Sequence, residues 1–107
     1  MSSFKHISPE QTYAKIENGE TLAIADIRDY QSYLNGHMPS ATHLNNETIT
    51  GFMQSTHIDT PVIVVCYHGI SSQQAAEYLV SQGYTEVYSM DQGFEGWRLR
   101  YPVESGV

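Results

Sequence analysis

The thiol of Cys66 is the one side chain in the sequence with strong nucleophilic potential. It follows the apolar run 62–65 and precedes a short segment that contains Gly69, and a helical pattern begins near Ser72. A strand, a short loop and a helix in this order aim several backbone N–H groups and the helix N-terminus at one point, which favours an anion there. We therefore expect the thiolate form of Cys66 to be favoured over the thiol.

The residues around the cysteine fit this interpretation. Gly69 allows the positive φ that a loop curled around a central atom requires. Ser71 and Ser72 can donate hydroxyl hydrogen bonds or cap the helix. The alternative is that Cys66 is a small buried hydrophobe, the usual role of a lone cysteine after such a strand. Its position favours function, because ligands of parallel sheets bind beyond the carboxyl ends of the strands.

Strand-like and helical segments alternate along the chain and must position this loop. The segment 8–11 (SPEQ) predicts a helix start with Ser8 as the cap, and Asp29 predicts the cap of a short helix over 30–35. The run 62–66 has no polar alternation, which predicts a strand buried on both faces of a parallel sheet. Further strands are predicted at 22–26, 42–44 and 86–89, and further helices at 47–54, 73–82 and 93–100. This alternation predicts an α/β fold with a mostly parallel sheet.

Composition excludes several classes of function. A net charge of −7 argues against nucleic acid and against an anionic membrane surface as partners. A single cysteine excludes an internal disulfide, and the histidines at 6, 37, 43, 57 and 68 show no helical ligand spacing, so we expect no metal site. The longest apolar run, 62–67, is far shorter than the roughly 20 residues of a bilayer span. We expect a cytoplasmic protein.

Four stretches of the sequence together resemble one protein family. The segment 66–72 (CYHGISS) resembles the active-site loop of the rhodanese sulfurtransferases, and most closely that of the single-domain thiosulfate sulfurtransferases of the GlpE type. The other stretches are DIR (26–28) with GHMPSA (36–41), DTPV (59–62), and GYTEVYS (83–89) with GFEGW (93–97). The similarity runs from about residue 4 to residue 102, nearly the whole chain.

The resemblance implies a fold and a reaction. The fold is a rhodanese-like α/β domain over residues 1–107, with a core from about 4 to 102 and a central, mostly parallel five-stranded sheet flanked by helices on both faces. In the implied double displacement, Cys66 attacks the outer sulfur of thiosulfate, sulfite leaves, and a persulfide remains on Cys66. Cyanide or a dithiol protein such as thioredoxin then removes that sulfur. No metal, nucleotide or organic cofactor is implied.

A ring of loop donors fits this chemistry. The terminal sulfur of a persulfide is anionic, and backbone donors stabilise it without a basic side chain. We assign the substrate-binding cradle to the N–H groups of the loop, namely Tyr67, His68, Gly69, Ile70, Ser71 and Ser72.

Three other functions are considered. Phosphatases and arsenate reductases of this fold carry a loop one residue longer, closed by an arginine, whereas Ser72 stands six residues after Cys66 and no Lys or Arg lies between 67 and 82. Phosphate transfer would then leave equatorial charge unpaired, so we reject it. Non-catalytic rhodanese-like binding modules typically lack the cysteine. A sulfur relay that accepts persulfide from a cysteine desulfurase stays open, because it needs the same cradle.

Several supporting residues have structural as well as functional interpretations. For Arg28 the family pattern suggests an ion pair, with Asp26 or Glu47, over contact with substrate. His68 could donate to an incoming anion when protonated, or be a solvated loop residue. His37 is expected to order its own loop.

Hydrophobic side chains outside the loop are expected mainly in the core. We place there Phe94 and Trp97, three apart on the last helix, together with Tyr78, Tyr84 and Tyr88. Ile70 stands where GlpE-type loops often carry a polar residue, commonly asparagine. Exposed at the rim, it would favour docking of an apolar protein surface; the alternative is that it packs on a neighbouring loop.

Overall fold

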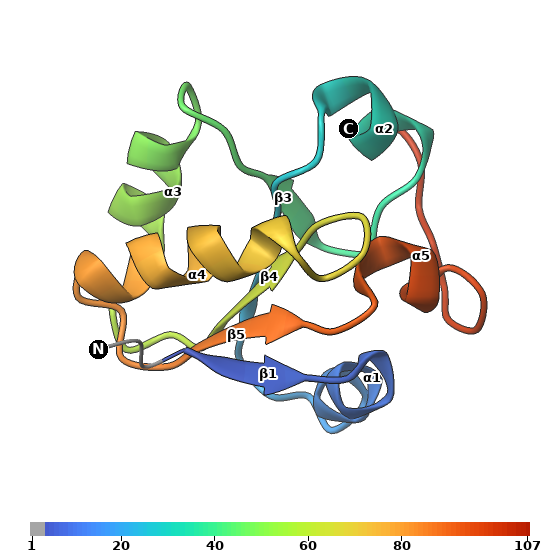
Figure 1. Cartoon of the computed structure of the whole chain (residues 1–107), viewed down its shortest axis with the longest axis horizontal. Helices are drawn as coiled ribbons and strands as arrows, with labels where there is room; N and C mark the ends of the chain where they lie inside the picture. Colours follow the sequence, from blue (N-terminus) through green and yellow to red (C-terminus); the bar gives the residue numbers. More distant parts are fainter. Residues whose placement is uncertain (1–3) are drawn as a thin grey trace.

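Strands and helices alternate along the chain, and the five strands form one parallel sheet in the order β1-β5-β4-β2-β3 (Figure 1). The computed structural model describes residues 4–107. The strands are β1 (Lys5–Ile7), β2 (Ala23–Asp26), β3 (Ala41–His43), β4 (Val62–Val65) and β5 (Val87–Met90). The helices are α1 (Pro9–Glu17), α2 (Tyr30–Asn35), α3 (Ile49–Ser55), α4 (Ser71–Ser81) and α5 (Gly93–Trp97). The predicted α/β fold is therefore confirmed.

Strand β4 is central, and all four of its residues are buried, as its unbroken apolar run predicts. Alternate residues point to opposite faces of the sheet. Val62 and Val64 pack in a core with residues of α3 and α4, while Ile63 and Val65 pack in a second core with residues of α1 and α5. Helices thus cover both faces of the sheet. Cys66 directly follows β4, so it lies at the end of the central strand.

Local capping signals define two helix starts as predicted. Ser8 caps α1 and forms a reciprocal capping box with Gln11, and Pro9 is the first helical residue. Asp29 caps α2 by accepting a hydrogen bond from the backbone N–H of Ser32, and α2 ends before Gly36. The second of these caps matters for the site, because Asp29 lies beside the cysteine loop.

Other predicted boundaries are wrong by one or more residues. Strand β1 is not among the strands predicted from the residue pattern, since only Ile7 of its three residues is buried and its place depends on pairing with β5. Strands β3 and β5 and helix α3 are shifted by one or two residues from the predicted ranges. Helix α5 ends at Trp97 rather than at Arg100. Helix α4 begins at Ser71 rather than Gln73, so both serines are within its first turn.

The core predictions for the aromatic residues hold with one exception. Phe94, Trp97 and Tyr84 are buried, and Tyr88 packs partly buried against the second core. Tyr78 is 46% exposed and is therefore not a core residue. No helix within residues 4–107 has the length and apolar character needed to cross a membrane.

Candidate active site

Cys66 lies one residue beyond β4, and its side chain is almost completely buried. The loop after it turns back over the sulfur: the N–H of Gly69 donates to Cys66 Sγ at 3.1 Å. Gly69 takes a φ of +84°, so the positive φ expected of it is confirmed. The thiol also donates to Ser72 Oγ at 3.2 Å, from the first turn of α4. The sulfur is thus held by a loop amide and a buried hydroxyl.

The surroundings of the thiol lower its pKa. Burial acts to raise the pKa of Cys66, but hydrogen bonds from the hydroxyls of Ser72 and Ser71 and from the N–H groups of Ser72 and Gly69 outweigh it and bring the pKa from 9.0 to about 7. These groups are neutral dipoles, and they stabilise the thiolate because hydrogen bonds to the charged form favour it. A large fraction of Cys66 is therefore ionised at neutral pH.

The predicted cradle residues divide into two groups. Gly69, Ser71 and Ser72 contribute to the environment of the sulfur. The side chains of Tyr67, His68 and Ile70 are exposed, and Ile70 is 75% exposed. The backbone N–H groups that bond the sulfur are those of Gly69 and Ser72, so the predicted donor role of the N–H groups of the other four loop residues stays a prediction.

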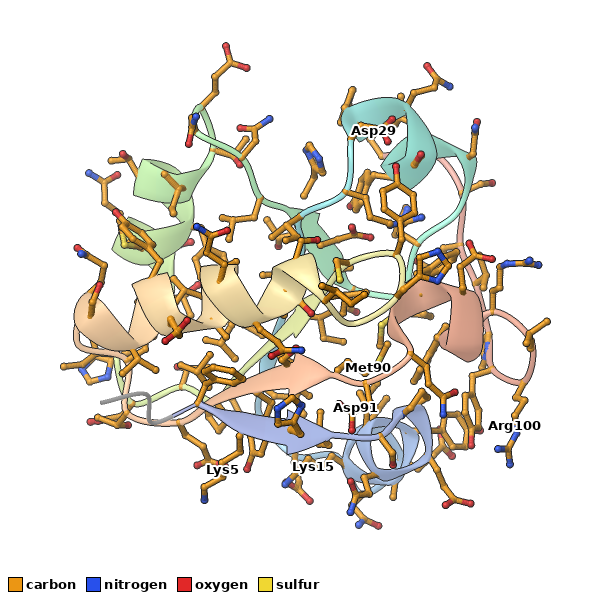
Figure 2. All side chains as sticks on the ribbon, in the orientation of Figure 1. Lys5, Lys15, Asp29, Met90, Asp91 and Arg100 are labelled. Carbon is orange, nitrogen blue, oxygen red and sulfur yellow. The ribbon has the colours of Figure 1, made fainter. Side chains whose placement is uncertain are left out.

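Tyr67 fastens the cysteine loop to helix α2. Its hydroxyl donates to the Asp29 carboxylate and lies 2.9 Å from the hydroxyl of Ser32. Hydrogen bonds from Tyr67 and Ser32 lower the pKa of Asp29 from 3.8 to about 2. Figure 2 labels Asp29 at the start of α2. The contact anchors the residue that follows the nucleophile.

The turn between β5 and α5 supports the loop from the other side, through contacts that sequence reasoning missed. The N–H of Phe94 donates to the carbonyl of Cys66 at 2.7 Å, and that of Glu95 to the carbonyl of Tyr67 at 3.1 Å. Gly93 has a φ of +58°, and a Cβ on it would lie 2.5 Å from the backbone of Cys66 and Tyr67. Only glycine permits this approach. The sole local signal is the glycine itself, whose partners are distant in sequence.

Arg28 is committed to a structural role, as expected. Its guanidinium donates to Asp26 Oδ2 at 2.7 Å and to the carbonyl of Gly36 at 2.6 Å, and it lies over the ring of Phe94 at 4.1 Å. The pair is almost fully buried, with side chains 3% and 1% exposed. The partner is Asp26 and not Glu47. His37 donates through Nδ1 to the carbonyl of Tyr33, which orders its own loop.

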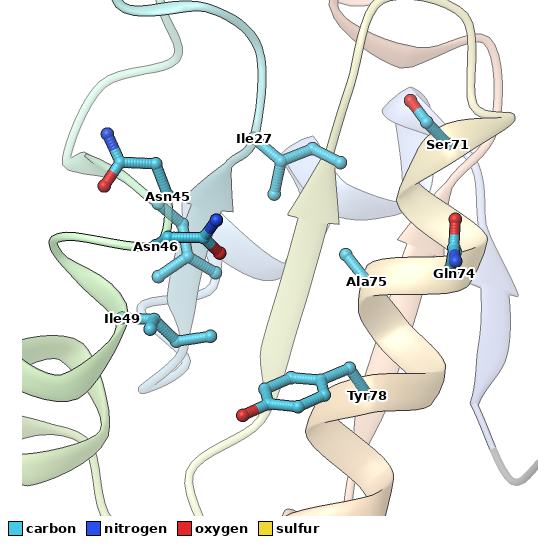
Figure 3. Close-up of a pocket in the computed structure, with 9 residues that line it drawn as sticks. Ile27, Asn45, Asn46, Ile49, Ser71, Gln74, Ala75 and Tyr78 are labelled. Atoms are coloured by element: carbon cyan, nitrogen blue, oxygen red, sulfur yellow. The ribbon is translucent and has the colours of Figure 1, made fainter.

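A cavity of about 450 Å³ opens beside the start of α4 (Figure 3). Its walls come from the segment after β2, the segment after β3 as far as the first residue of α3, and one side of α4. Ser71 lines the end of the cavity nearest the cysteine loop, and Tyr78, which was expected in the core, lines the far end. Among its lining residues none is charged; they are Ile27, Leu44, Asn45, Asn46, Ile49, Ser71, Gln74, Ala75 and Tyr78. Over the described part of the chain, no three His, Cys, Asp or Glu side chains gather closely enough to hold a metal ion.

A buried thiol with a lowered pKa, in a glycine-containing loop between a central parallel strand and a helix, defines a cysteine-dependent enzyme site of the α/β class. Residues 8–100 match the family model described as rhodanese-like domain. The chain belongs to this family.

Known proteins of this family are similar over almost the whole chain. The thiosulfate sulfurtransferase GlpE of Pseudomonas entomophila (strain L48) is 52% identical over 105 residues, which cover 98% of this chain and 94% of that protein. Solved structures share the fold at lower identity. The Alr3790 protein from Anabaena sp. has a TM-score of 0.84 at 23% identity, covering 94% of this chain and 81% of that one. A rhodanese-like domain protein from Staphylococcus aureus has a TM-score of 0.82 at 22% identity, covering 96% and 99%.

Proposed function

We propose that this protein is a thiosulfate sulfurtransferase that carries sulfur as a persulfide on Cys66. The observation that carries the proposal is the convergence of neutral donors on one buried thiol whose pKa is about 7. The name of the GlpE relative, 52% identical over nearly the full length of both chains, supports thiosulfate as the donor.

In the first step, the Cys66 thiolate attacks the outer sulfur of thiosulfate. A bond forms between the two sulfurs, and the bond to the sulfonate sulfur breaks with its electron pair, so sulfite leaves as a dianion. The electron pair of the thiolate becomes the new sulfur–sulfur bond, and the terminal sulfur of the persulfide keeps its negative charge. Donors that already point into the loop need no reorganisation to stabilise it.

In the second step, an acceptor attacks the terminal sulfur. Cyanide takes it as thiocyanate, and the bonding electrons return to Cys66 as the thiolate. A dithiol protein such as thioredoxin takes it as a persulfide, and its second thiol then expels hydrosulfide. A low pKa favours this step as well, because it makes the Cys66 thiolate a better leaving group.

The electrostatics of the loop argue against phosphate transfer. Between Arg28 and Arg98 the sequence has no Lys or Arg, and the Arg28 guanidinium is engaged by Asp26 and Gly36. A transferring phosphoryl group needs cationic partners for its equatorial oxygens, whereas a persulfide carries one diffuse charge that dipoles can stabilise.

Intact-mass spectrometry tests the proposal. Incubation with thiosulfate should add one sulfur atom to the protein, and cyanide should then remove it with release of thiocyanate. Cys66→Ser must abolish both changes, and Ser55→Ala, a surface hydroxyl on α3, serves as the matched control. No gain from thiosulfate, but a gain from a persulfide-loaded cysteine desulfurase, would reject thiosulfate as donor in favour of a sulfur relay.

We further propose that residues 1–107 act as a single catalytic domain in the cytoplasm. A lone catalytic thiol that must return to its reduced form after each cycle suits a reducing compartment.

A further inference from the structure

A second buried hydroxyl lies behind the sulfur. Ser89 is on β5, where it pairs with Val64 of β4, and its side chain is 0% exposed. Its Oγ lies 2.8 Å from Ser72 Oγ, which lies 3.2 Å from Cys66 Sγ. Ser72 is also 0% exposed. The sulfur and the two hydroxyl oxygens therefore form a chain of three atoms, and the two serines in it are fully buried.

The number of protons in this chain depends on the charge of the sulfur. Each of the two links, Cys66 to Ser72 and Ser72 to Ser89, uses one proton. With a neutral thiol there are three protons for two links, so one donor has no acceptor within the chain. With a thiolate, the two hydroxyl protons fill the two links. Both links can be filled in either state, but only around the anion is no proton left over.

We propose that Ser89 is a positioning residue: its hydroxyl donates to Ser72 Oγ and so directs the single Ser72 proton toward the Cys66 sulfur. Among residues 4–107, Ser72 is the one hydrogen-bond partner of the Ser89 side chain. A donor that acts through a second hydroxyl strengthens the second hydrogen bond by polarising it, and the effect is larger in a buried chain than in water. The inference rests on the proposed role of Cys66 as nucleophile.

The titratable and charged groups near the loop are exposed or are bonded to other partners, so we assign the stabilisation of the Cys66 thiolate to the hydroxyls and the backbone N–H groups. His68 and Tyr67 of the loop are exposed. The Asp29 carboxylate beside the loop accepts hydrogen bonds from the hydroxyl of Tyr67 and from Ser32. Asp26 with Arg28 and Glu95 with Arg98 form ion pairs, and His6 Nδ1 lies 2.8 Å from the Asp91 carboxylate.

The test follows the rate of Cys66 alkylation by iodoacetamide against pH, with intact mass to count the label. In Ser72→Ala the midpoint should rise by about 1 unit, because a hydrogen bond to the charged form is lost. In Ser89→Ala it should rise by about 0.5 unit, because that bond is only weakened. In the double variant it should equal the Ser72→Ala midpoint, because Ser89 acts through Ser72.

Two further variants separate positioning from packing. Ser89→Thr keeps the hydroxyl and should keep the wild-type midpoint. Thr12→Val removes another fully buried hydroxyl, one on α1 that donates to the carbonyl of Ser8, and should lower thermal stability without moving the midpoint. An unchanged midpoint in Ser89→Ala, or shifts that add in the double variant, would overturn the inference. Alkylation reports ionisation of the thiol whether or not thiosulfate is a substrate, so failure of the proposed function would be seen separately.

Discussion

Two buried anionic groups lie at the carboxyl ends of adjacent strands and are stabilised in opposite ways. Asp26 ends β2 and is paired with the Arg28 guanidinium, which also donates to Gly36. Cys66 follows β4, the neighbouring strand, and its sulfur has an amide and hydroxyls as partners. The first group is engaged by a counter-charge, whereas neutral dipoles leave the second free to give its electrons to a substrate.

This contrast explains how a protein of net charge −7 can keep a reactive anion in its interior. A cation beside the sulfur would form an ion pair with the Cys66 thiolate, and it would also form one with the thiosulfate anion. Dipoles fixed by the fold need no counter-ion, and in the proposed reaction they act on any atom that carries the charge, the Cys66 sulfur before transfer and the added sulfur after it. The ion pair holds the loops in place, and the dipoles act on the reacting atoms.

The largest expected effect comes from breaking the ion pair. Asp26→Asn leaves the Arg28 guanidinium buried without its counter-charge and should destabilise the fold by about 3–5 kcal/mol. Urea unfolding followed by circular dichroism measures this loss. The double variant Asp26→Leu with Arg28→Met removes both charges and should recover most of it. Equal stability of Asp26→Asn and wild type would show that the pair contributes nothing.

The next effect comes from separating the loop from α5. In Gly93→Ala, the new Cβ would collide with the Cys66 and Tyr67 backbone at a positive φ, so we expect a loss of about 3 kcal/mol and of nearly all turnover. Gly51→Ala is the control: it lies in α3 with nothing within 4 Å of the added Cβ. That substitution should stabilise the helix by about 0.5–1 kcal/mol. Full activity of Gly93→Ala would contradict the close approach.

A smaller effect is expected when one donor to the sulfur is removed, and its pH dependence shows whether that donor acts on ionisation or on the shape of the loop. Ser72→Ala should lower sulfur transfer about fivefold or more at about pH 6.5, because the pKa of Cys66 rises and less thiolate is present. Above about pH 9 the rate should return toward that of wild type, since both thiols are then ionised. The rate of thiocyanate release against pH checks this. A uniform loss at every pH would instead mean that Ser72 only maintains the shape of the loop.

The smallest expected effect concerns the exposed rim. Ile70, in the cysteine loop, is 75% exposed, and we expect Ile70→Asn to lower the ratio of thioredoxin turnover to cyanide turnover by about threefold, through loss of apolar contact. The variant Ile58→Asn changes an exposed isoleucine outside the loop and should leave the ratio unchanged. An unchanged ratio in Ile70→Asn would remove the docking role of this side chain.

The sequence predicts best what is determined locally. The capping box of Ser8, the cap at Asp29 and the buried strand β4 follow from short patterns, and all three are confirmed. The cysteine loop is predictable because strand, glycine and helix are contiguous. The positive φ of Gly69 and the ion pair of Arg28 with Asp26 are confirmed for the same reason.

What the sequence could not predict depends on contacts between distant segments. The approach of Gly93 to Cys66 and the link from Ser72 to Ser89 join residues far apart in the chain, and no local pattern encodes them. Strand β1 is short, and only one of its residues is buried, so it shows no alternation. Tyr78, predicted in the core, is 46% exposed and lines the cavity, whose opposite wall comes from a segment distant in the sequence.

The ionisation of Cys66 in the wild-type protein tests most directly whether neutral donors alone sustain the reactive anion. The rate of its alkylation should rise about tenfold per pH unit at acidic pH and level off above neutrality, with a midpoint at a pKa of about 7. A midpoint at the ordinary value of 9.0 would mean that the loop amides and hydroxyls do not stabilise the thiolate.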